Sequence, residues 1–183
     1  LRGDAMEKDN LNQAPCELLD KQEIHEVLMR YCRGIDRCDE ELLRGVYHPD
    51  ATDNHGLFVG KAADFIPWAL KGLKRDLSTK HYVTNELIEL RGEVAYVESY
   101  VLAVHHRTAK RGGLVDLIMA GRYIDRFAKR AGVWKIADRK VAMDWARIDP
   151  VEQSFSVEKF LTGKRSREDE VYLRDPGSAR RSS

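Results

Sequence analysis

The first part of the chain carries apolar residues at helical spacing. From Ile24 to Ile35 they recur at steps that place them on one face of an amphipathic helix. Asp20 and Glu23 have the spacing of a capping box, so we expect this helix to begin at Asp20 and to end at 36–38. Shorter apolar patterns bounded by helix-stop signals predict two more helices, over 39–47 and 62–72.

The second part of the chain changes to extended segments separated by short turns. Its pattern predicts four strands, over 80–91, 94–107, 114–128 and 133–146. The turns contain glycine and are short enough for hairpins, so these strands form an antiparallel meander, and residues 52–59 add a shorter extended piece. Helices first and strands afterwards indicate an α+β fold. We expect a cone-shaped roll, with three N-terminal helices packed on a curved antiparallel sheet around a cavity.

Composition divides the chain into one domain with two tails. Residues 1–16 are polar and are expected to form a flexible arm, and 17–149 form the α+β domain. Residues 150–183 are a tail with a dense charge run over 164–170, and we expect its end, 176–183, to be disordered. Phe155 and Phe160 in this tail could cover the mouth of a cavity or a neighbouring subunit.

The last predicted strand shows which side chains it buries. Its odd positions carry the more apolar set, which ends in Met143 and Trp145. The other face bears Trp134 and Ile136, and if exposed it would be a surface for homo-oligomer formation. Arg139 lies on the odd face, where it either points into a ligand cavity or pairs with a carboxylate or reaches a rim.

The charge balance and cysteine content exclude several classes of function. Lys and Arg number 31 and Asp and Glu number 30, so the chain lacks the basic excess typical of nucleic-acid binding. No apolar run is long enough to cross a membrane, and the start, Leu1 to Asp4, lacks the apolar region of a signal peptide. Three cysteines are too few for a disulfide framework, so we expect a cytoplasmic location.

Sequence motifs for metal, nucleotide and nucleophilic chemistry are absent. The six histidines show no paired zinc spacing, and no Cys-x-x-Cys occurs. The glycine-rich nucleotide motifs and the nucleophile-elbow motif are also missing. We therefore expect neither a metal nor a cofactor.

Acid–base chemistry remains, and two residues stand out for it. Asp36 ends the apolar first helix, where its carboxylate can face inward, and His81 opens the first long strand. An Asp–His pair holds the imidazole in one tautomer and raises its basicity near neutral pH. Either residue alone would more often be structural, Asp36 as a surface or capping group and His81 as a hydrogen-bonded core residue.

Five segments resemble a known family. They begin at Tyr31 (Tyr-Cys-Arg-Gly-Ile-Asp), Tyr47 (Tyr-His-Pro-Asp-Ala-Thr-Asp-Asn-His-Gly), Lys80 (Lys-His-Tyr-Val-Thr-Asn), Gly121 (Gly-Arg-Tyr-Ile-Asp-Arg-Phe) and Gly132 (Gly-Val-Trp-Lys-Ile-Ala-Asp-Arg). Their order and spacing resemble the SnoaL-like branch of the nuclear transport factor 2-like superfamily. The resemblance covers residues 17–147 and implies the same α+β cone with a deep apolar cavity.

The resemblance also implies a site. Scytalone dehydratase, hexachlorocyclohexane dehydrochlorinase and bile-acid 7α-dehydratase are cofactor-free lyases of this branch, and Asp36 and His81 match the places of their catalytic Asp and His. Tyr31 matches a tyrosine of the bile-acid enzyme. A second histidine, used by scytalone dehydratase, could be His105 or His106, of which at most one faces the cavity. Arg139 does not match the late arginine of the bile-acid enzyme.

From these observations we expect a lyase whose catalytic residues are Asp36, His81, Tyr31 and Arg139. Its substrate would be a small, apolar, cyclic molecule bound by Phe58, Phe65, Trp68, Met119, Met143, Trp145, His55 and His105. A ketosteroid-isomerase-like isomerase or a polyketide cyclase is the first alternative. The second is a non-catalytic binding or scaffold module, such as the small subunit of a ring-hydroxylating dioxygenase. We expect a homo-oligomer, dimer or trimer.

Overall fold

The computed structural model describes residues 3–152 and 155–174. Its helices are α1 (Gly3–Arg37), α2 (Glu40–Val46), α3 (Ala62–Leu73) and α4 (Glu170–Leu173). Its strands are β1 (Tyr47–Asn54), β2 (Val59–Lys61), β3 (Ser78–Arg91), β4 (Val94–Thr108), β5 (Leu114–Arg130) and β6 (Val133–Pro150). The predicted α+β class is confirmed, and the four long strands lie close to their expected bounds. The end of the tail, expected to be disordered, lies outside the described residues.

One curved sheet contains all six strands, in the order β2-β1-β6-β5-β4-β3. The meander from β3 to β6 is antiparallel, as the short turns predict. β1 instead runs parallel to β6. Parallel neighbours need a long connection, and here α3 and the strands β3–β5 lie between β1 and β6 in the chain. Residues 52–59, expected as one extended piece, are divided between β1 and β2, which pair antiparallel.

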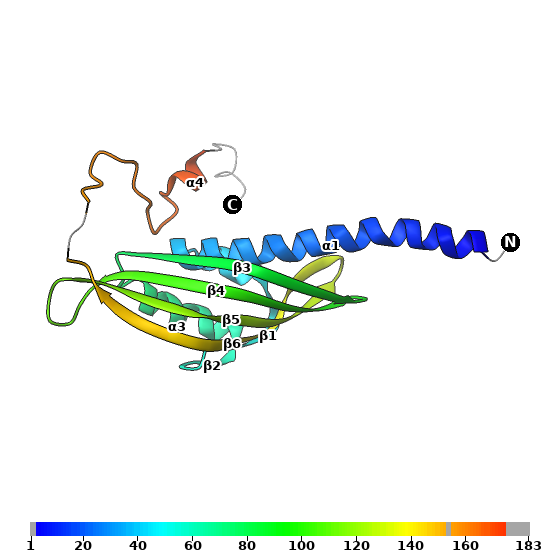
Figure 1. Ribbon diagram of the computed structural model, residues 1–183, viewed down its shortest axis with the longest axis horizontal. Coiled ribbons are helices and arrows are strands. Elements are labelled where there is room, and N and C mark those ends of the chain that lie inside the picture. Colours follow the sequence, from blue (N-terminus) through cyan, green and yellow to red (C-terminus); the bar gives the residue numbers. More distant parts are fainter. Residues whose placement is uncertain (1–2, 153–154, 175–183) are drawn as a thin grey trace.

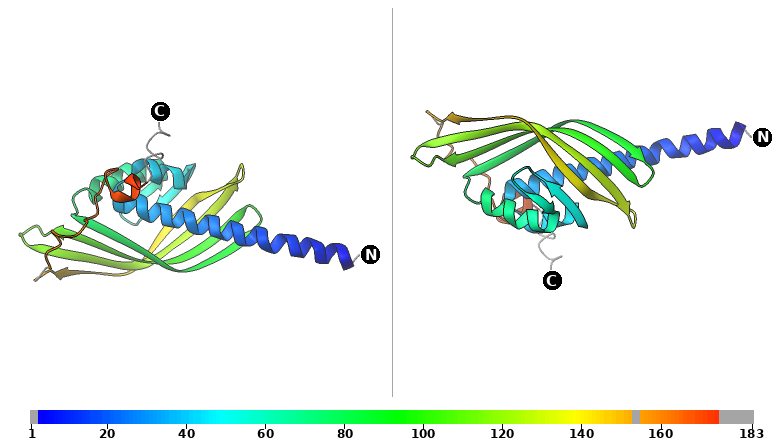
Figure 2. Two further views of the ribbon diagram at one scale, coloured as in Figure 1. Left: turned by 90° about the horizontal axis from the view of Figure 1, so that it is seen from above. Right: turned by 90° about the horizontal axis from the view of Figure 1, so that it is seen from below.

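The helices cover one side of the sheet, which curves around them (Figures 1 and 2). α1 lies along β3, and its N-terminal part projects beyond the sheet (Figure 1). Burying apolar surface is the main favourable term in folding, and here it joins the helices to the sheet. The predicted helical stripe is buried, and it packs with side chains of α3 and of the inner sheet face, including Phe65, Phe127 and Ile136.

The first helix begins at Gly3, so the start that we predicted at Asp20 is wrong. The carboxylate of Asp20 is used for tertiary contacts rather than for a cap. It accepts hydrogen bonds from Lys129 Nζ at 2.6 Å and from Trp134 Nε1 at 2.8 Å. Residues 3–16, expected as an arm, are the first turns of α1.

Glycine at position 34 lets α1 and α2 approach each other closely. A Cβ atom there would lie 2.7 Å from Cγ of Leu43, a fully buried residue of α2. α1 then ends at Cys38, which takes a left-handed backbone conformation with φ of 52°. Asp39 caps α2 by accepting a hydrogen bond from the backbone N–H of Leu42 at 3.0 Å. The last turn of α1 is therefore fixed in place beside the sheet.

Register shifts in the sheet change which side chains of β6 face the helices. One shift lies at Arg126/Phe127 and another at Ala120/Gly121, each opposite an extra residue of β6. Trp134 and Ile136 are consequently buried under the helices, so the exposed oligomer surface that we expected of them is wrong. Arg139 follows the shift at Arg126/Phe127 along β6, and its side chain faces the helices, as its odd position predicts.

The segment after β6 returns along the molecule to the C-terminal half of α1 (Figures 1 and 2). Arg167 pairs with Glu41 at 2.6 Å, and Arg37 pairs with Asp169 at 3.1 Å. Phe155 and Phe160 contact each other, with ring centroids 6.2 Å apart. Within the described ranges, no helix has both the length and the apolar character needed to span a membrane.

The close approach at Gly121 gives a test of the register shift in β5 and β6. A Cβ atom at this position would lie 2.3 Å from the backbone oxygen of Ala142, so Gly121→Ala has to move the backbone of β6. We expect a loss of about 1–3 kcal/mol in the free energy of unfolding, measured by urea denaturation. Gly72→Ala is the control, because it adds a methyl group to open space in α3 and should be neutral or slightly stabilising. Equal stabilities for the two variants would contradict the close contact.

Candidate active site

The last turn of α1 and the start of β3 bring Asp36 and His81 together. His81 Nδ1 lies 2.8 Å from Asp36 Oδ1, which also accepts a hydrogen bond from Thr79 Oγ1 at 2.9 Å. Asp36 Oδ2 accepts the backbone N–H of His81 at 3.1 Å. Because β3 is an edge strand, such outward N–H groups lack a strand partner, and Asp36 supplies one. Ring and backbone of His81 are thus both held by one carboxylate.

This environment keeps Asp36 ionised. Burial alone would raise the pKa of its carboxyl group, but the hydrogen bonds from His81 and Thr79 outweigh burial and leave the pKa below its ordinary value. An ionised carboxylate can only accept, so Nδ1 of His81 carries the proton and Nε2 is left as the acceptor. Both side chains are mostly buried, with 8% of His81 and 13% of Asp36 exposed. The arrangement fits a general base.

A second histidine–aspartate pair lies beside the first. His105, on β4, pairs through Nδ1 with Asp76 Oδ2 at 2.8 Å, and Asp76 also pairs with Arg107 at 3.0 Å. Strand register places His105 opposite Thr79, on the same face as His81. The rings of His81 and His105 meet edge to face, with centroids 5.5 Å apart. His106 points to the opposite face, where it bonds Asp116 at 2.6 Å, so His105 is the histidine that joins the site.

His105 is neutral in the folded protein. Burial lowers the pKa of its imidazole, and the bond to Asp76 offsets this only in part. Its Nε2 is buried and has no hydrogen-bond partner among the described residues. A buried acceptor without a donor is costly in free energy.

A third pair lies next to Tyr31. His55 Nδ1 bonds Asp53, whose other oxygen accepts the hydroxyl of Tyr47 at 2.7 Å. Tyr31 donates its hydroxyl to His55 Nε2 at 3.4 Å. The His55 ring stacks on Phe65 at 4.3 Å. Tyr31 and His55 therefore contact each other, and neither makes a described hydrogen bond to Asp36 or His81.

Arg139 is fully buried, and of the alternatives that the sequence left open for it, the structure shows the pair with a carboxylate. Its Nε and Nη2 donate to the two oxygens of Asp125, at 2.8 and 2.6 Å. The guanidinium lies between the rings of Tyr31 and Tyr123, about 4 Å from each centroid. Although burial lowers the pKa of Arg139, the charge of Asp125 raises it well above its ordinary value. The expectation that Arg139 holds a substrate oxygen is therefore wrong, because Asp125 occupies its fork.

The expected apolar wall is only partly on one face. Met119 is in register with Ala103 and His81, and Met143 is in register with Gly121 on the same face. Trp145 pairs with Ala120 and lies on the opposite face, because the register shift at Ala120/Gly121 reverses the alternation. Its expected place in the wall is therefore wrong. The remaining expected members form an aromatic cluster with ring centroids 5.5–6.1 Å apart: Phe58, Phe65 and Trp68.

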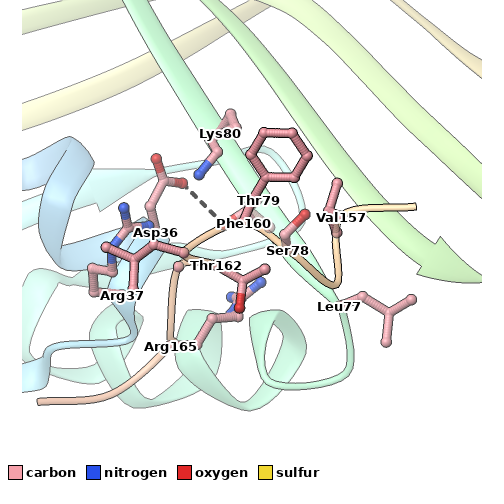
Figure 3. A pocket seen from close by; sticks show the side chains of 12 residues that line it. Asp36, Arg37, Leu77, Ser78, Thr79, Lys80, Val157, Phe160, Thr162 and Arg165 are labelled. Atoms are coloured by element: carbon pink, nitrogen blue, oxygen red, sulfur yellow. Dashed lines mark hydrogen bonds between the residues drawn. The ribbon is translucent and has the colours of Figure 1, made fainter. Parts of the chain in front are cut away.

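A cavity of about 420 Å³ lies beside Asp36 (Figure 3). It is bordered by the end of α1, the start of β3 and the C-terminal segment 157–165. Asp36 and its hydrogen-bond donor Thr79 both line this cavity, but neither His81 nor His105 does. No cluster of three or more potential metal ligands occurs in the described part of the chain.

Sequence reasoning missed the acidic partners of two histidines. Asp76 lies in the turn before β3, 29 residues from His105, and nothing in the sequence links the two. Asp53 is only two residues from His55, and this short spacing in Asp53-Asn54-His55 was a usable signal. Thr79, two residues before His81, was also missed as a donor to Asp36.

Comparison with known proteins agrees with this architecture. The profile of a family described as SnoaL-like domain matches residues 16–140. A putative scytalone dehydratase from Novosphingobium aromaticivorans is 23% identical, with a TM-score of 0.66, over 78% of this chain and 99% of that one. Hexachlorocyclohexane dehydrochlorinase LinA-type3 from Novosphingobium barchaimii is 20% identical, with a TM-score of 0.62, over 77% and 96%.

A third solved structure is a variant of Rv3472, described as a protein of unknown function from Mycobacterium tuberculosis. It is 25% identical with a TM-score of 0.60, over 72% of this chain and 75% of that one. No curated protein matches the chain. These likenesses support the fold, and the chemistry depends on the residues described above.

The Arg139–Asp125 pair yields a stability prediction. Asp125→Asn keeps the volume but leaves the guanidinium without its counter-charge, so we expect a loss of about 3–5 kcal/mol in the free energy of unfolding. Asp50→Asn, which breaks the exposed pair with Arg130, should have a much smaller effect in the same urea denaturation series. A small effect of Asp125→Asn would show that the buried charge finds another partner.

The lowered pKa of His105 predicts a pH dependence of stability. Below the ordinary histidine value of 6.5 the unfolded chain binds a proton that the folded chain refuses, so stability falls as the pH drops from 7 to 5. His105→Gln should reduce this slope, by up to about 1.4 kcal/mol per pH unit. His106→Gln is the matched control on the opposite face. Identical slopes for wild type and His105→Gln would contradict the neutral state of His105.

Proposed function

The chain belongs to the SnoaL-like domain family, and from this premise we propose that it is a cofactor-independent lyase acting on a small, apolar, cyclic molecule. The observation that carries the proposal is the hydrogen bond of 2.8 Å between His81 and an Asp36 carboxylate that stays ionised. This pair provides a base without a metal. Two similar structures, described as a putative scytalone dehydratase and a hexachlorocyclohexane dehydrochlorinase, support the choice of elimination.

In the proposed reaction, His81 Nε2 takes a proton from a carbon next to an activating group. The electron pair of that C–H bond becomes the new C=C bond, and the leaving group departs from the neighbouring carbon with its own bonding pair. Asp36 stabilises the imidazolium that forms, as its pairing with Nδ1 allows. A halide leaves as the anion, whereas a hydroxyl group takes the proton back from His81 and leaves as water.

His105 binds the substrate in this proposal. Its neutral ring offers Nε2 as an acceptor close to His81, which suits a hydroxyl group of the substrate. Met119 and Met143 lie on the same sheet face as His81 and would contact the apolar body. Tyr31 and His55 are expected to act more remotely, because their hydroxyl and imidazole groups bond each other.

We favour elimination over isomerisation because two similar structures are described as a putative scytalone dehydratase and a dehydrochlorinase. An isomerase must return the proton to another carbon of the same molecule, whereas in a dehydration the proton leaves with the hydroxyl group as water. Homo-oligomer formation and a cytoplasmic location remain predictions from the sequence.

The proposal is tested by the variants His81→Ala and His106→Ala. The substrates are a panel of β-hydroxy cyclic ketones and chlorinated cyclohexanes, and the new double bond is followed by absorbance or mass spectrometry. We expect His81→Ala to lose about 10²–10⁴-fold in kcat/KM, because it lacks the base, while His106→Ala keeps wild-type activity. Full activity of His81→Ala would overturn the assignment, and ligand binding without turnover would favour a binding module.

A further inference from the structure

The cavity beside Asp36 has the size and the lining of a ligand site that the proposed reaction does not use. Its volume of about 420 Å³ falls in the usual range of roughly 300–1,000 Å³ for small-molecule sites. Two walls come from the domain, namely the end of α1 and the start of β3, and the third is the returning C-terminal segment (Figure 3). The lining residues come from all three parts.

Positive charge is in excess around this cavity. Arg37, Lys80 and Arg165 line it, against Asp36 alone. Arg37 is paired with Asp169, which lies outside the lining, at 3.1 Å. The two carboxylates, Asp36 and Asp169, balance two of the three cationic side chains, so a net charge of one positive unit remains. A bound monoanion would neutralise it, whereas a dianion would place excess negative charge beside Asp36.

Arg165 is the group that most clearly lacks a partner. Its Nη2 contacts only the sulfur of Cys38, at 3.1 Å, a weak acceptor. Its Nε and Nη1 are buried and have no hydrogen-bond partner among the described residues. Buried guanidinium donors are costly when unpaired, and a carboxylate accepts two of them at once. Asp36 does not serve here, because its oxygens already accept bonds from His81 and Thr79.

The lining also contains apolar side chains that are exposed. Leu77, Val157 and Phe160 each leave more than half of their surface uncovered. Figure 3 shows these side chains around the same space as Lys80 and Arg165. An exposed apolar surface next to unpaired donors fits a ligand with one charged end and one apolar end.

We propose that this cavity binds a small organic monoanion, a carboxylate attached to an aromatic or alicyclic body. The carboxylate would accept hydrogen bonds from Arg165 and Lys80, and the body would pack on Phe160 and Leu77. The cavity adjoins the proposed lyase site, with which it shares Asp36 and Thr79, but its lining contains neither the proposed base His81 nor His105. Its binding can therefore be measured whether or not the protein is a lyase.

The test is isothermal titration calorimetry of the full chain with benzoate at neutral pH. We expect one benzoate per chain, and no binding of benzamide, which has the same shape without the charge. Arg165→Met should weaken binding at least tenfold, and Arg165→Lys should restore part of it. Because Arg165 also contacts Cys38, Lys80→Met on β3 provides a second variant that leaves the segment's contact in place. Arg147→Met is the control, an exposed cation of β6 paired with Asp149.

Three outcomes would overturn the proposal. The first is no binding of benzoate by the wild-type protein. The second is equal affinity in wild type, Arg165→Met and Lys80→Met. The third is a loss of binding in His81→Gln while Arg165→Met binds normally, because the anion would then occupy the proposed active site.

Discussion

The geometry of this protein depends on irregularities in its sheet. Three register shifts interrupt the meander from β3 to β6, at Thr84/Leu87 on β3, at Ala120/Gly121 and at Arg126/Phe127. Each adds a residue on one strand, which bends the sheet and increases its twist. The bent sheet partly surrounds the helices, so that the end of α1 meets the start of β3. Without that bend the carboxylate of Asp36 would not reach both the ring and the backbone of His81.

The buried charge pair of Arg139 and Asp125 lies next to the register shift at Arg126/Phe127. It connects β5 to β6, and the two flanking tyrosines come from β5 and α1. A buried ion pair is not by itself a strong source of stability, since desolvation offsets much of the attraction. Here the fork of the guanidinium fixes one register between the two strands. It also packs against Tyr31, whose hydroxyl group orients His55.

The same register shifts explain what the sequence could and could not predict. Alternation with a period of two identified the strands, and up to the first shift it is valid. On β6 it fails twice, so Trp134 and Trp145 are each assigned to the wrong face, while Arg139 and Met143 between them are placed correctly. An extra residue opposite a single partner leaves no signal in one strand's sequence. The sequence could predict the pairing of Asp36 with His81 because both residues lie in segments that resemble the family. It could not predict the pairing of Asp76 with His105, because Asp76 lies in a turn outside those segments.

Four described histidines bond an aspartate through Nδ1, and the surroundings of the three other than His106 separate their roles. His55, His81 and His105 each bond a carboxylate through Nδ1, which leaves Nε2 of each ring as an acceptor. In His55 that acceptor is used by Tyr31, so the ring is a structural link in the core. In His81 and His105 it has no hydrogen-bond partner among the described residues, and the two rings face one another on one side of the sheet. Burial differs as well, since Nε2 of His105 is shielded and its ring stays neutral. Two acceptors of unequal burial, side by side, can divide proton removal and substrate binding between them, which a single histidine cannot do.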